Sequence, residues 1–348
     1  EITMINLVCL MPLFNHVAFL NRSVMSVIDQ KTDFNIKLII IDDCSTDGSY
    51  ELALNLEKKY KDKIIVYKNK TNLKLLKSIY QGYAYLKGFD YFCVLDPDDW
   101  YTSDDKFQVA VDFLEKHKKY SMYMNNISIL QDGQEHLFVD NNIDSFEFSF
   151  EDYKKKKKTL FIQTSGVVYR NIYFKESYNK KFSEIFSYPF PQSFRADGFR
   201  WFWYLKSGPA FYCKTPKSVY NYNGQGIWSQ MKEIDQSFVN SKLYISCSYF
   251  FKHEREFFQK QAFREIVNSL IKIGGLEKLD EKRLNQLKDI LKFIDFFKYS
   301  LFFILGGKIF LKKIFYRFLI CLNFKTDKIR NKLLALKIIL KLRNLKIK

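Results

Sequence analysis

The chain has 348 residues, of which 47% are hydrophobic and 27% are charged, and its formal net charge at pH 7 is +18. Apolar side chains are abundant enough to build a core, which excludes an intrinsically disordered chain. The basic charge is concentrated in residues 249–348, where 24 Lys and Arg against 9 Asp and Glu give +15 and leave +3 for the first 248 residues.

Short apolar segments alternate with helical patterns in the first hundred residues. We expect strands at residues 5–11, 37–41, 63–67 and 91–95 and helices at residues 18–28, 50–60 and 75–86. The strand segments are short and almost continuously apolar, which is typical of strands buried on both faces of a parallel sheet. The alternating order therefore predicts an α/β fold with a Rossmann-like, mostly parallel sheet flanked by helices, whose ligands bind at the carboxyl ends of the strands.

Two of these strands run directly into acidic turns. The first turn is Asp42-Asp43-Cys44-Ser45-Thr46-Asp47-Gly48-Ser49, in which Asp47 or Ser49 is expected to cap the next helix. The second turn is Asp96-Pro97-Asp98-Asp99. Because parallel strands end at the same edge of a sheet, we expect both turns to face one cleft.

The second acidic turn has the composition of a cation site. Three carboxylates this close repel one another, so that one stays protonated unless a cation shares the site. Carboxylate oxygens suit Mg²⁺ and Mn²⁺, which commonly link one or two carboxylates to a substrate diphosphate. The alternative is an ordinary strand-ending turn, because Asp and Pro are common turn formers.

Together with further motifs, the two acidic turns resemble the inverting family 2 glycosyltransferases of the GT-A fold, of the type that builds bacterial surface glycans. The other matching motifs are Pro12-Leu13-Phe14-Asn15, Asn72-Leu73, Gly82 and Asp197. The resemblance covers the first hundred residues closely, extends more weakly to about residue 230 and is absent beyond. It implies a nucleotide-sugar-binding half at residues 1–100 and an acceptor and catalytic-base half at residues 101–230. For residues 231–348, the composition and the spacing of Lys and Arg predict a C-terminal α-helical, basic extension.

The resemblance places the donor nucleotide at the first acidic turn. In such enzymes this turn holds the base and ribose, a role that falls to Asp42 or Asp43, with Pro12 and Asn15 in the same site. Asp96 would contact the ribose, or the metal through water.

The resemblance also implies a metal ligand and a sugar pocket. Asp98 would ligate the Mn²⁺ or Mg²⁺ that spans the donor phosphates, since the departing nucleoside diphosphate gains negative charge that a divalent ion offsets. Asp99 ranks lower, as a supporting group or a helix cap. Ser165 and Gly166 lie in a segment at residues 161–170 that would line the donor-sugar pocket, with an ordinary core strand as the alternative.

The catalytic base implied by the resemblance is Asp197, just before an aromatic helical run at residues 199–205. It would take the proton from the acceptor hydroxyl that attacks the anomeric carbon, and a single displacement inverts the stereochemistry. The family usually has an acidic residue before this Asp, whereas Ala196 stands here, and a plain N-cap is the alternative role. Trp228 is expected to stack on a sugar ring, and the tryptophans of the helical run to pack in the core.

A second departure from the family follows Asn72-Leu73, where Gly and later Asn are common. Here Lys74, Ile79 and Tyr80 occupy these positions. Any donor contact in this segment is lost or is supplied by Lys74 or Lys77. For both lysines we expect a solvated helix surface.

The basic tail is expected to lie on a membrane and not to cross it. Its longest uncharged run, residues 299–307, has nine residues, and a spanning helix needs about twenty. Lys and Arg recur at helical intervals between apolar residues, which is the pattern of helices in the interface of an anionic membrane. Packing on the protein's own domain is the alternative, and nucleic acid is not expected as a partner because phosphate binding does not require so much Phe and Leu.

Further features narrow the location and the chemistry. The six cysteines show no paired spacing, so we expect reduced cytoplasmic thiols, and we expect no secretory signal. The four histidines show no metal-ligand spacing. A P-loop and a Gly-x-Gly-x-x-Gly element are missing, which argues against an NTPase or a dinucleotide enzyme.

These features predict a metal-dependent inverting glycosyltransferase that is cytoplasmic and peripheral at the inner face of the cytoplasmic membrane. It would move a sugar from a nucleotide-diphosphate donor, with UDP-sugars favoured, to a hydroxyl of a capsule, lipooligosaccharide or other surface-glycan or lipid-linked acceptor. Three alternatives stay open: a non-catalytic sugar-nucleotide-binding protein of this fold, a transferase of a non-sugar group, and a nucleotidyltransferase, whose Gly-rich first loop is missing here.

Overall fold

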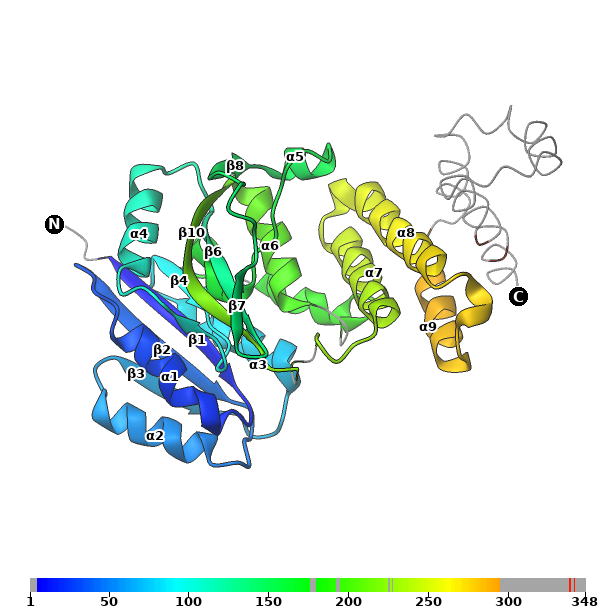
Figure 1. Ribbon diagram of the computed structural model, residues 1–348. Coiled ribbons are helices and arrows are strands. Elements are labelled where there is room, and N and C mark those ends of the chain that lie inside the picture. The colour runs from blue at the N-terminus through cyan, green and yellow to red at the C-terminus, as the bar shows by residue number, and fades with distance from the viewer. Residues whose placement is uncertain are drawn as a thin grey trace. The chain divides into compact units, whose positions relative to one another are not determined.

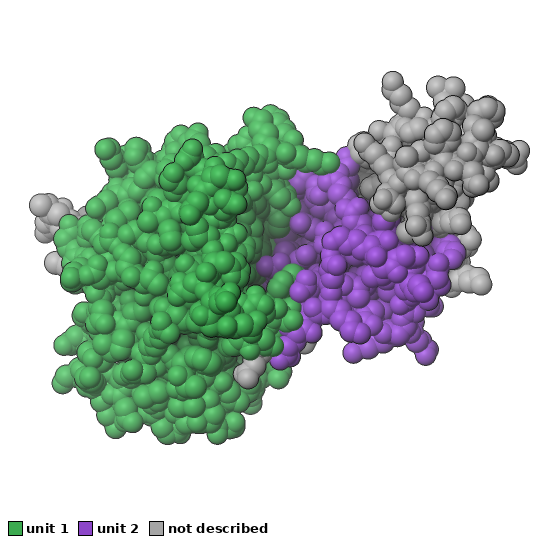
Figure 2. All heavy atoms as spheres, viewed as in Figure 1, with its two compact units in different colours: residues 1–183, 196–229 green, residues 184–195, 230–348 purple. Residues whose placement is uncertain are grey.

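The structure is a computed structural model that describes residues 5–175, 180–191, 195–224, 226, 228–294, 338 and 341. The chain divides into two compact units, which are coloured separately in Figure 2. Unit 1 comprises residues 1–183 and 196–229, and unit 2 comprises residues 184–195 and 230–348. The expected division of the catalytic domain at residue 100 stays a prediction.

The first half of unit 1 is a parallel sheet in the strand order β3-β2-β1-β4 (Figure 1). Its strands are β1 (Asn6–Leu13), β2 (Asn35–Asp42), β3 (Ile64–Lys68) and β4 (Tyr91–Val94). Its helices are α1 (Val17–Ile28), α2 (Ser49–Lys59) and α3 (Lys74–Gly82), and a 3-10 turn, η1 (Tyr83–Leu86), continues α3. All the strands and helices expected in this half are present, in the expected order.

β1 runs two residues beyond its expected end and includes Pro12, which has no backbone N–H. The carbonyl of Leu10 accepts a hydrogen bond from Leu95 at 3.0 Å, on the β4 side of the strand. Pro12 lies two residues later and therefore faces the same side, where β4 has already ended at Val94. No partner strand needs its missing donor, so the proline is tolerated.

The start of α2 differs from the expected cap. Its N-cap is Gly48, with φ +93°, so neither Asp47 nor Ser49 occupies that position. A left-handed backbone favours Gly because it has no Cβ. Asp47 instead accepts hydrogen bonds from the amides of Ser49 at 2.9 Å and Val17 at 3.0 Å, so it satisfies backbone donors at the starts of two helices.

The second half of unit 1 continues the sheet in the order β4-β9-β6-β10-β5 with mixed strand directions. Its strands are β5 (Trp100–Tyr101), β6 (Met122–Gln131), β7 (Gln134–Leu137), β8 (Phe146–Phe148), β9 (Val167–Arg170) and β10 (Ala210–Tyr222). Its helices are α4 (Lys106–Lys116), α5 (Phe150–Lys154) and α6 (Ala196–Ser207). β9 is antiparallel to both β4 and β6 and so joins the two halves of the sheet.

The core of unit 1 fixes how closely the helices approach the sheet. Its buried members come from strands and helices alike and include Leu7, Cys9, Leu20, Val24, Leu38, Ile40 and Phe107. At Gly82 of α3, a Cβ would lie 2.6 Å from Cδ1 of Ile41. A larger residue here would require the Ile41 side chain to move, which is consistent with a Gly at this position.

Unit 2 is helical, and its main helices are α7 (Glu233–Phe250), α8 (Arg255–Lys272) and α9 (Glu281–Leu291). They share an apolar core that includes Phe238, Ile245, Phe263, Ile266 and Leu287. The segment at residues 184–195 packs within the same unit. Ser246 donates a hydrogen bond to the carbonyl of Pro189 at 2.7 Å, and Arg195 donates to the side chain of Asn240 at 3.0 Å. The expected helical C-terminal region is thus confirmed.

Most of the expected membrane-facing tail, residues 295–337, lies outside the described residues. Among the helices that the structure does describe, none combines the length and the apolar character needed to cross a membrane. The described cysteines, which are Cys9, Cys44, Cys93, Cys213 and Cys247, form no disulfide bond.

Candidate active site

The first acidic turn is held rigidly at the carboxyl end of β2. Asp42 is fully buried, and its two carboxylate oxygens accept hydrogen bonds from the amide of Ser45 at 3.3 and 3.2 Å. Asp43 is 4% exposed, and its Oδ1 accepts from the side chain of Asn69 at 2.7 Å and from the amide of Leu73 at 2.8 Å. Both carboxylates are therefore fixed by amide donors, as buried charges require.

The loop after β1 is tied to this turn. The amide of Asn15 donates to the hydroxyl of Ser45 at 3.0 Å, and its side-chain oxygen accepts from the amide of Thr46 at 2.8 Å. Asn15 and Cys44 both have left-handed backbones, with φ of +56° and +66°. Each such conformation costs about 1–3 kcal/mol and persists where the surroundings determine it. The two loops thus form one ordered edge beside β1 and β2.

The second acidic turn follows β4, which lies next to β1 in the sheet. Oδ2 of Asp98 accepts a hydrogen bond from the side chain of Asn223 at 3.2 Å and lies 3.9 Å from Nε2 of His16. Asp99 is 1% exposed and accepts from the amide of Asn221 at 3.0 Å. The end of β10 therefore supports this turn, and the loop after β1 contacts both acidic turns.

Negative charges are crowded at this site. Burial and the charges of Asp98 and Asp197 raise the pKa of Asp96 to about 7. Burial together with Asp96 and Asp98 raises the pKa of Asp99 well above its usual value. The positive charge of Arg200 lowers the pKa of Asp96 and so acts in the opposite direction. Carboxyl groups from both halves of unit 1 thus share one environment, in which added positive charge would stabilise their ionised forms.

Asp197 reaches this environment from α6. The helix begins at Ala196, so Asp197 lies within the first turn and not at the N-cap position that was its alternative role. Its Oδ1 accepts a hydrogen bond from the amide of Gly198 at 2.7 Å. The helix dipole favours a negative charge at this end. The tryptophans of α6 are buried, as expected.

A buried arginine lies one helical turn beyond this carboxylate. Arg200 is 1% exposed and donates a hydrogen bond to the hydroxyl of Tyr83 at 2.6 Å. Its guanidinium carbon lies 5.3 Å from the centre of the Tyr169 ring. These two tyrosines hold the permanent positive charge of Arg200 in the protein interior, where solvent does not screen it. From there it acts on the pKa of Asp96.

The other residues predicted to bind the donor lie in the body of unit 1. Ser165 is fully buried in the turn before β9, and a Cβ at Gly166 would lie 2.9 Å from the carbonyl oxygen of Asn125. Pro12 is buried within β1, and Trp228 is half-buried in the turn after β10. Their contacts with a donor or acceptor stay predictions.

The divergent segment of α3 serves packing. Lys74 and Lys77 are exposed, as expected for a solvated helix surface. Ile79 and Tyr80 are buried, with 4% and 2% exposure. Of the three divergent positions, Ile79 and Tyr80 therefore hold α3 against the sheet, and Lys74 does not.

The carboxylates of the second turn fit a divalent cation. Asp96 and Asp98 offer the hard oxygen ligands that Mg²⁺ and Mn²⁺ prefer, and burial, together with the negative charges of Asp98 and Asp197, raises the pKa of Asp96. In the part of the chain that the structure describes, no group of three or more His, Cys, Asp or Glu forms a complete metal cage. A cation shared with a diphosphate needs only one or two protein carboxylates, and the residues present meet that requirement.

Sequence reasoning missed three residues of this site. His16 directly follows a predicted donor-binding residue, and Arg200 is a lone charge inside an aromatic run, so local signals existed for both. Asn223 carries no such local signal. Its amide reaches Asp98 from a segment that is 125 residues away in the chain.

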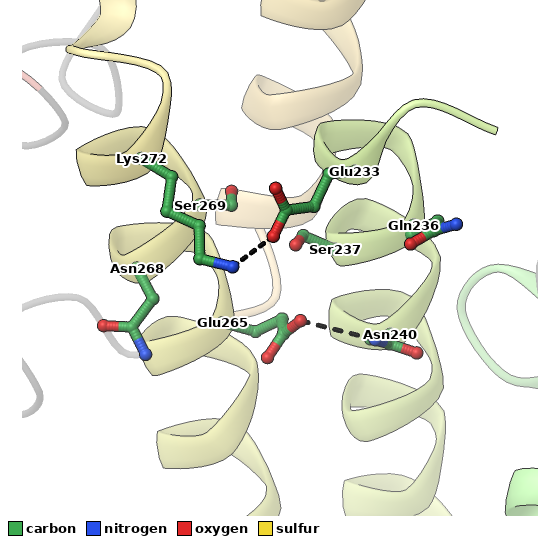
Figure 3. A pocket seen from close by; sticks show the side chains of 8 residues that line it. All are labelled: Glu233, Gln236, Ser237, Asn240, Glu265, Asn268, Ser269 and Lys272. Carbon is green, nitrogen blue, oxygen red and sulfur yellow. Dashed lines mark hydrogen bonds and ion pairs between the residues drawn. The ribbon is translucent and has the colours of Figure 1, made fainter. Parts of the chain in front are cut away.

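Unit 2 has a polar hollow of its own between α7 and α8, shown in Figure 3. It is lined by Glu233, Gln236, Ser237, Asn240, Glu265, Asn268, Ser269 and Lys272. Lys272 pairs with Glu233, and Asn240 donates a hydrogen bond to Glu265 at 3.3 Å. The charge of Lys272 is thus neutralised by Glu233, and Glu265 leaves the lining with a net negative charge. This charge disfavours the binding of a nucleotide diphosphate in the hollow.

Curated proteins match about a third of the chain. EpsE of Bacillus subtilis (strain 168), whose name carries a provisional glycosyltransferase assignment, is 34% identical over 113 residues. The minor teichoic acid biosynthesis protein GgaB of the same organism is 34% identical over 110 residues. These matches cover 32% and 31% of this chain but only 40% and 12% of the two relatives, so the chain spans less than half of either.

Among solved structures, residues 1–349 of S. aureus TarS match with a TM-score of 0.57 at 14% identity, over 84% of this chain and 82% of the TarS chain. The same protein in complex with UDP-GlcNAc gives a TM-score of 0.58 at 13% identity over the same shares. This likeness shows the fold, and it confirms the expected GT-A architecture. The model of Glycosyl transferase family 2 matches residues 8–182, which is half of the chain and includes both acidic turns. The chain therefore belongs to glycosyl transferase family 2.

Proposed function

We propose that this chain transfers a sugar from a nucleotide-diphosphate donor to a hydroxyl acceptor, with inversion at the anomeric carbon. The observation that carries the proposal is the grouping of Asp96, Asp98 and Asp197, in which the pKa of Asp96 is raised to about 7. Such a group supplies both a cation-binding carboxylate and a separate carboxylate that can accept a proton. Family membership agrees with this reaction.

The nucleoside part of the donor is assigned to the edge formed by the first acidic turn. Asp42 or Asp43 would accept hydrogen bonds from the base and the ribose, because each carboxylate has more acceptor sites than its amide donors use. Asn15 and Pro12 lie in the adjoining loop and strand end. A rigid edge of this kind binds with little ordering cost.

The diphosphate part is assigned to the second acidic turn. Asp98 is the proposed ligand of Mn²⁺ or Mg²⁺, and Asp96 would contact the ribose or the cation through water. When bound, the divalent cation offsets the negative charge that develops on the departing nucleoside diphosphate. The hydrogen bond from Asn223 fixes the Asp98 carboxylate for this contact. The buried charge of Arg200 lowers the pKa of Asp96 and so favours its ionised form.

Asp197 is the proposed base. It would accept the proton of the acceptor hydroxyl while that oxygen attacks the anomeric carbon and the bond to the diphosphate breaks. One displacement without a covalent intermediate gives inversion. A positioned carboxylate in this role contributes about 10²–10⁴-fold to the rate.

The proposed substrates and the proposed location rest on more general observations. UDP-sugars are the favoured donors, because TarS, which shares the fold, is known in complex with UDP-GlcNAc. A capsule, lipooligosaccharide, teichoic-acid-like or other surface-glycan acceptor agrees with the name of GgaB. The net charge of +15 over residues 249–348 would hold the enzyme at the anionic inner face of the cytoplasmic membrane.

The test is a donor screen with the purified protein. UDP-, GDP-, CDP- and dTDP-sugars are added with and without Mn²⁺, and the melting temperature and the release of nucleoside diphosphate are measured. We expect stabilisation by one nucleotide class that requires Mn²⁺ and disappears in Asp98→Asn but persists in Asp112→Asn, a change on the exposed side of α4. No stabilisation by any donor would overturn the proposal. Stabilisation without any donor turnover would favour the non-catalytic sugar-nucleotide-binding alternative.

A further inference from the structure

His16 stands between a backbone carbonyl and a carboxylate. Nδ1 of its ring lies 2.7 Å from the carbonyl oxygen of Phe14. Nε2 lies 3.9 Å from Oδ2 of Asp98, and the two side chains are 32% and 17% exposed. The two nitrogens of one ring therefore face two different oxygen atoms.

The Phe14 contact fixes the proton on one nitrogen. A carbonyl oxygen only accepts hydrogen bonds, so at this distance Nδ1 carries the hydrogen. In the neutral ring, Nε2 then presents a lone pair. That lone pair faces the oxygen of a carboxylate, so a cation between the two atoms would stabilise the arrangement.

The distance between Nε2 and the Asp98 oxygen suits a shared ion. At 3.9 Å the two atoms are too far apart for a direct hydrogen bond. Bonds from nitrogen or oxygen ligands to divalent cations of this size are about 2.1 Å long, so both atoms can contact the same ion. Metal-binding histidines also typically donate their other N–H to a carbonyl or carboxylate, as His16 does to Phe14.

Hydrogen bonds from other residues hold both partners in place independently of any ion. The amide of His16 donates a hydrogen bond to the hydroxyl of Ser49 at 2.8 Å, and the preceding Asn15 is bonded to the first acidic turn. On the other side, Asn223 donates to the same Asp98 oxygen at 3.2 Å. The nitrogen and the oxygen thus face one another as part of a preorganised pair.

We propose that His16 is a second protein ligand of the divalent cation at Asp98, which gives the donor site a mixed nitrogen and oxygen ligand set. The inference rests on the proposed function, because it places the cation in the donor site. Mg²⁺ strongly prefers oxygen ligands, whereas imidazole binds first-row transition metals. The ligand set is therefore selective: it favours Mn²⁺, and still more Co²⁺, over Mg²⁺.

The decisive measurement is the electron spin-echo modulation of Mn²⁺ bound to the full chain in the presence of UDP. We expect modulation from a coordinated ¹⁴N nucleus in the unaltered protein and in His136→Gln, whose histidine is exposed on β7. We expect it to be absent in His16→Gln. In the same samples, the Mn²⁺ dissociation constant is expected to rise about tenfold or more in His16→Gln, while the Mg²⁺ constant changes less.

The outcomes separate this inference from the function on which it rests. Retained ¹⁴N modulation in His16→Gln, or Mn²⁺ binding without nitrogen coupling in the unaltered protein, would overturn the role of His16 while Asp98→Asn still abolishes binding. A protein that binds no Mn²⁺ with UDP, and in which Asp98→Asn changes nothing, would instead overturn the proposed function. Melting temperatures of the variants without Mn²⁺ show that each is folded. The backbone bond of His16 to Ser49 does not depend on the altered side chain.

Discussion

The carboxylate of Asp99 accepts a hydrogen bond from the backbone amide of Asn221 at 3.0 Å, across 122 residues of sequence. Two residues further along β10 and its loop, Asn223 reaches Asp98 at 3.2 Å. The acidic turn after β4 and the end of β10 are therefore joined twice. Asp99 is 1% exposed, so it supports the acidic turn from the protein interior and is not available to contact a substrate.

Two substitutions of Asp99 distinguish the contribution of its hydrogen bond from the contribution of its negative charge. Burial and the neighbouring carboxylates raise its pKa, which favours the neutral acid, and Asn resembles that form. Asp99→Asn is expected to change the free energy of unfolding by less than about 1 kcal/mol, and Asp99→Ala to lower it by about 1–3 kcal/mol because the amide of Asn221 loses its partner. Urea unfolding at neutral pH measures both. Equal losses in the two variants would contradict a supporting role.

Asp197→Asn isolates the proposed base. The Asn side chain keeps an oxygen that can accept the hydrogen bond from Gly198. We therefore expect donor and cation binding to persist while kcat falls by about 10²–10⁴-fold. Steady-state kinetics and a thermal-shift titration with donor provide the two readouts. A variant that keeps its turnover would show that another group removes the proton.

Cation binding is expected to depend on pH through Asp96. The pKa of this carboxyl group is about 7, against about 3.9 for an unperturbed Asp. Protons and the cation compete for the ionised group, so Mn²⁺ affinity should rise as the pH increases toward about 7 and then level off. Calorimetric titration with UDP present measures the trend. Asp96→Asn should flatten the profile, and a persisting slope would assign the titration to another group.

The same carboxyl group predicts how stability without the cation varies with pH. Its pKa is higher in the folded chain than in the unfolded chain, so the folded state binds more protons between about pH 4 and about pH 7. The stability that this group contributes is fully present below the unfolded value and is lost as the pH rises through the folded value. Melting temperatures should fall over this range in the unaltered protein and fall less in Asp96→Asn. A rise over this range, or an equal fall in the variant, would contradict the assignment.

Arg200 is expected to set the position of that pH profile. Arg200→Met removes the positive charge that lowers the pKa of Asp96, so the midpoint should move to higher pH and Mn²⁺ affinity near pH 7 should fall. Arg200→Lys keeps the charge and should shift the midpoint less, although the bond to Tyr83 is disturbed. Mn²⁺ titrations across pH compare the two variants. An unchanged midpoint in Arg200→Met would show that its charge does not reach the site.

The parallel half of the fold was predictable because its signals are local. Each strand there is a short apolar run that ends in a polar turn, and each helix follows directly, so the order alone specified the sheet. The second half lacks such signals. β10 contains the polar stretch Lys214-Thr215-Pro216-Lys217 and is irregularly paired with β6, and β9 lies between strands that are distant in sequence. Pairings of that kind depend on the folded sheet and not on the neighbouring residues.

The same distinction holds for the site. The carboxylates were identified because they follow strand ends, where the chain order places them at one edge. His16 and Asp98 are 82 positions apart in the numbering, and spacing rules for metal ligands consider only short separations. The role of Arg200 likewise depends on Tyr83 and Tyr169, which the fold and not the sequence places beside it.

The division of the chain between the units determines where the protein can be shortened. The segment at residues 184–195 belongs to unit 2 although unit 1 resumes after it. Its Tyr188 and Phe190 lie against Tyr249 and Phe293, with ring centres 6.1 and 5.1 Å apart. Ending the protein after β10 would remove Tyr249 and Phe293, the partners of these rings. It would leave exposed aromatic side chains within residues 184–195, which favours aggregation. A stop codon placed after residue 294 would keep both aromatic pairs but would remove Ile338, which is buried in the core of unit 2, and Lys341, which pairs with Glu277 at 3.0 Å. The compact helical unit therefore extends to the last part of the chain, and a shortened form should keep those residues.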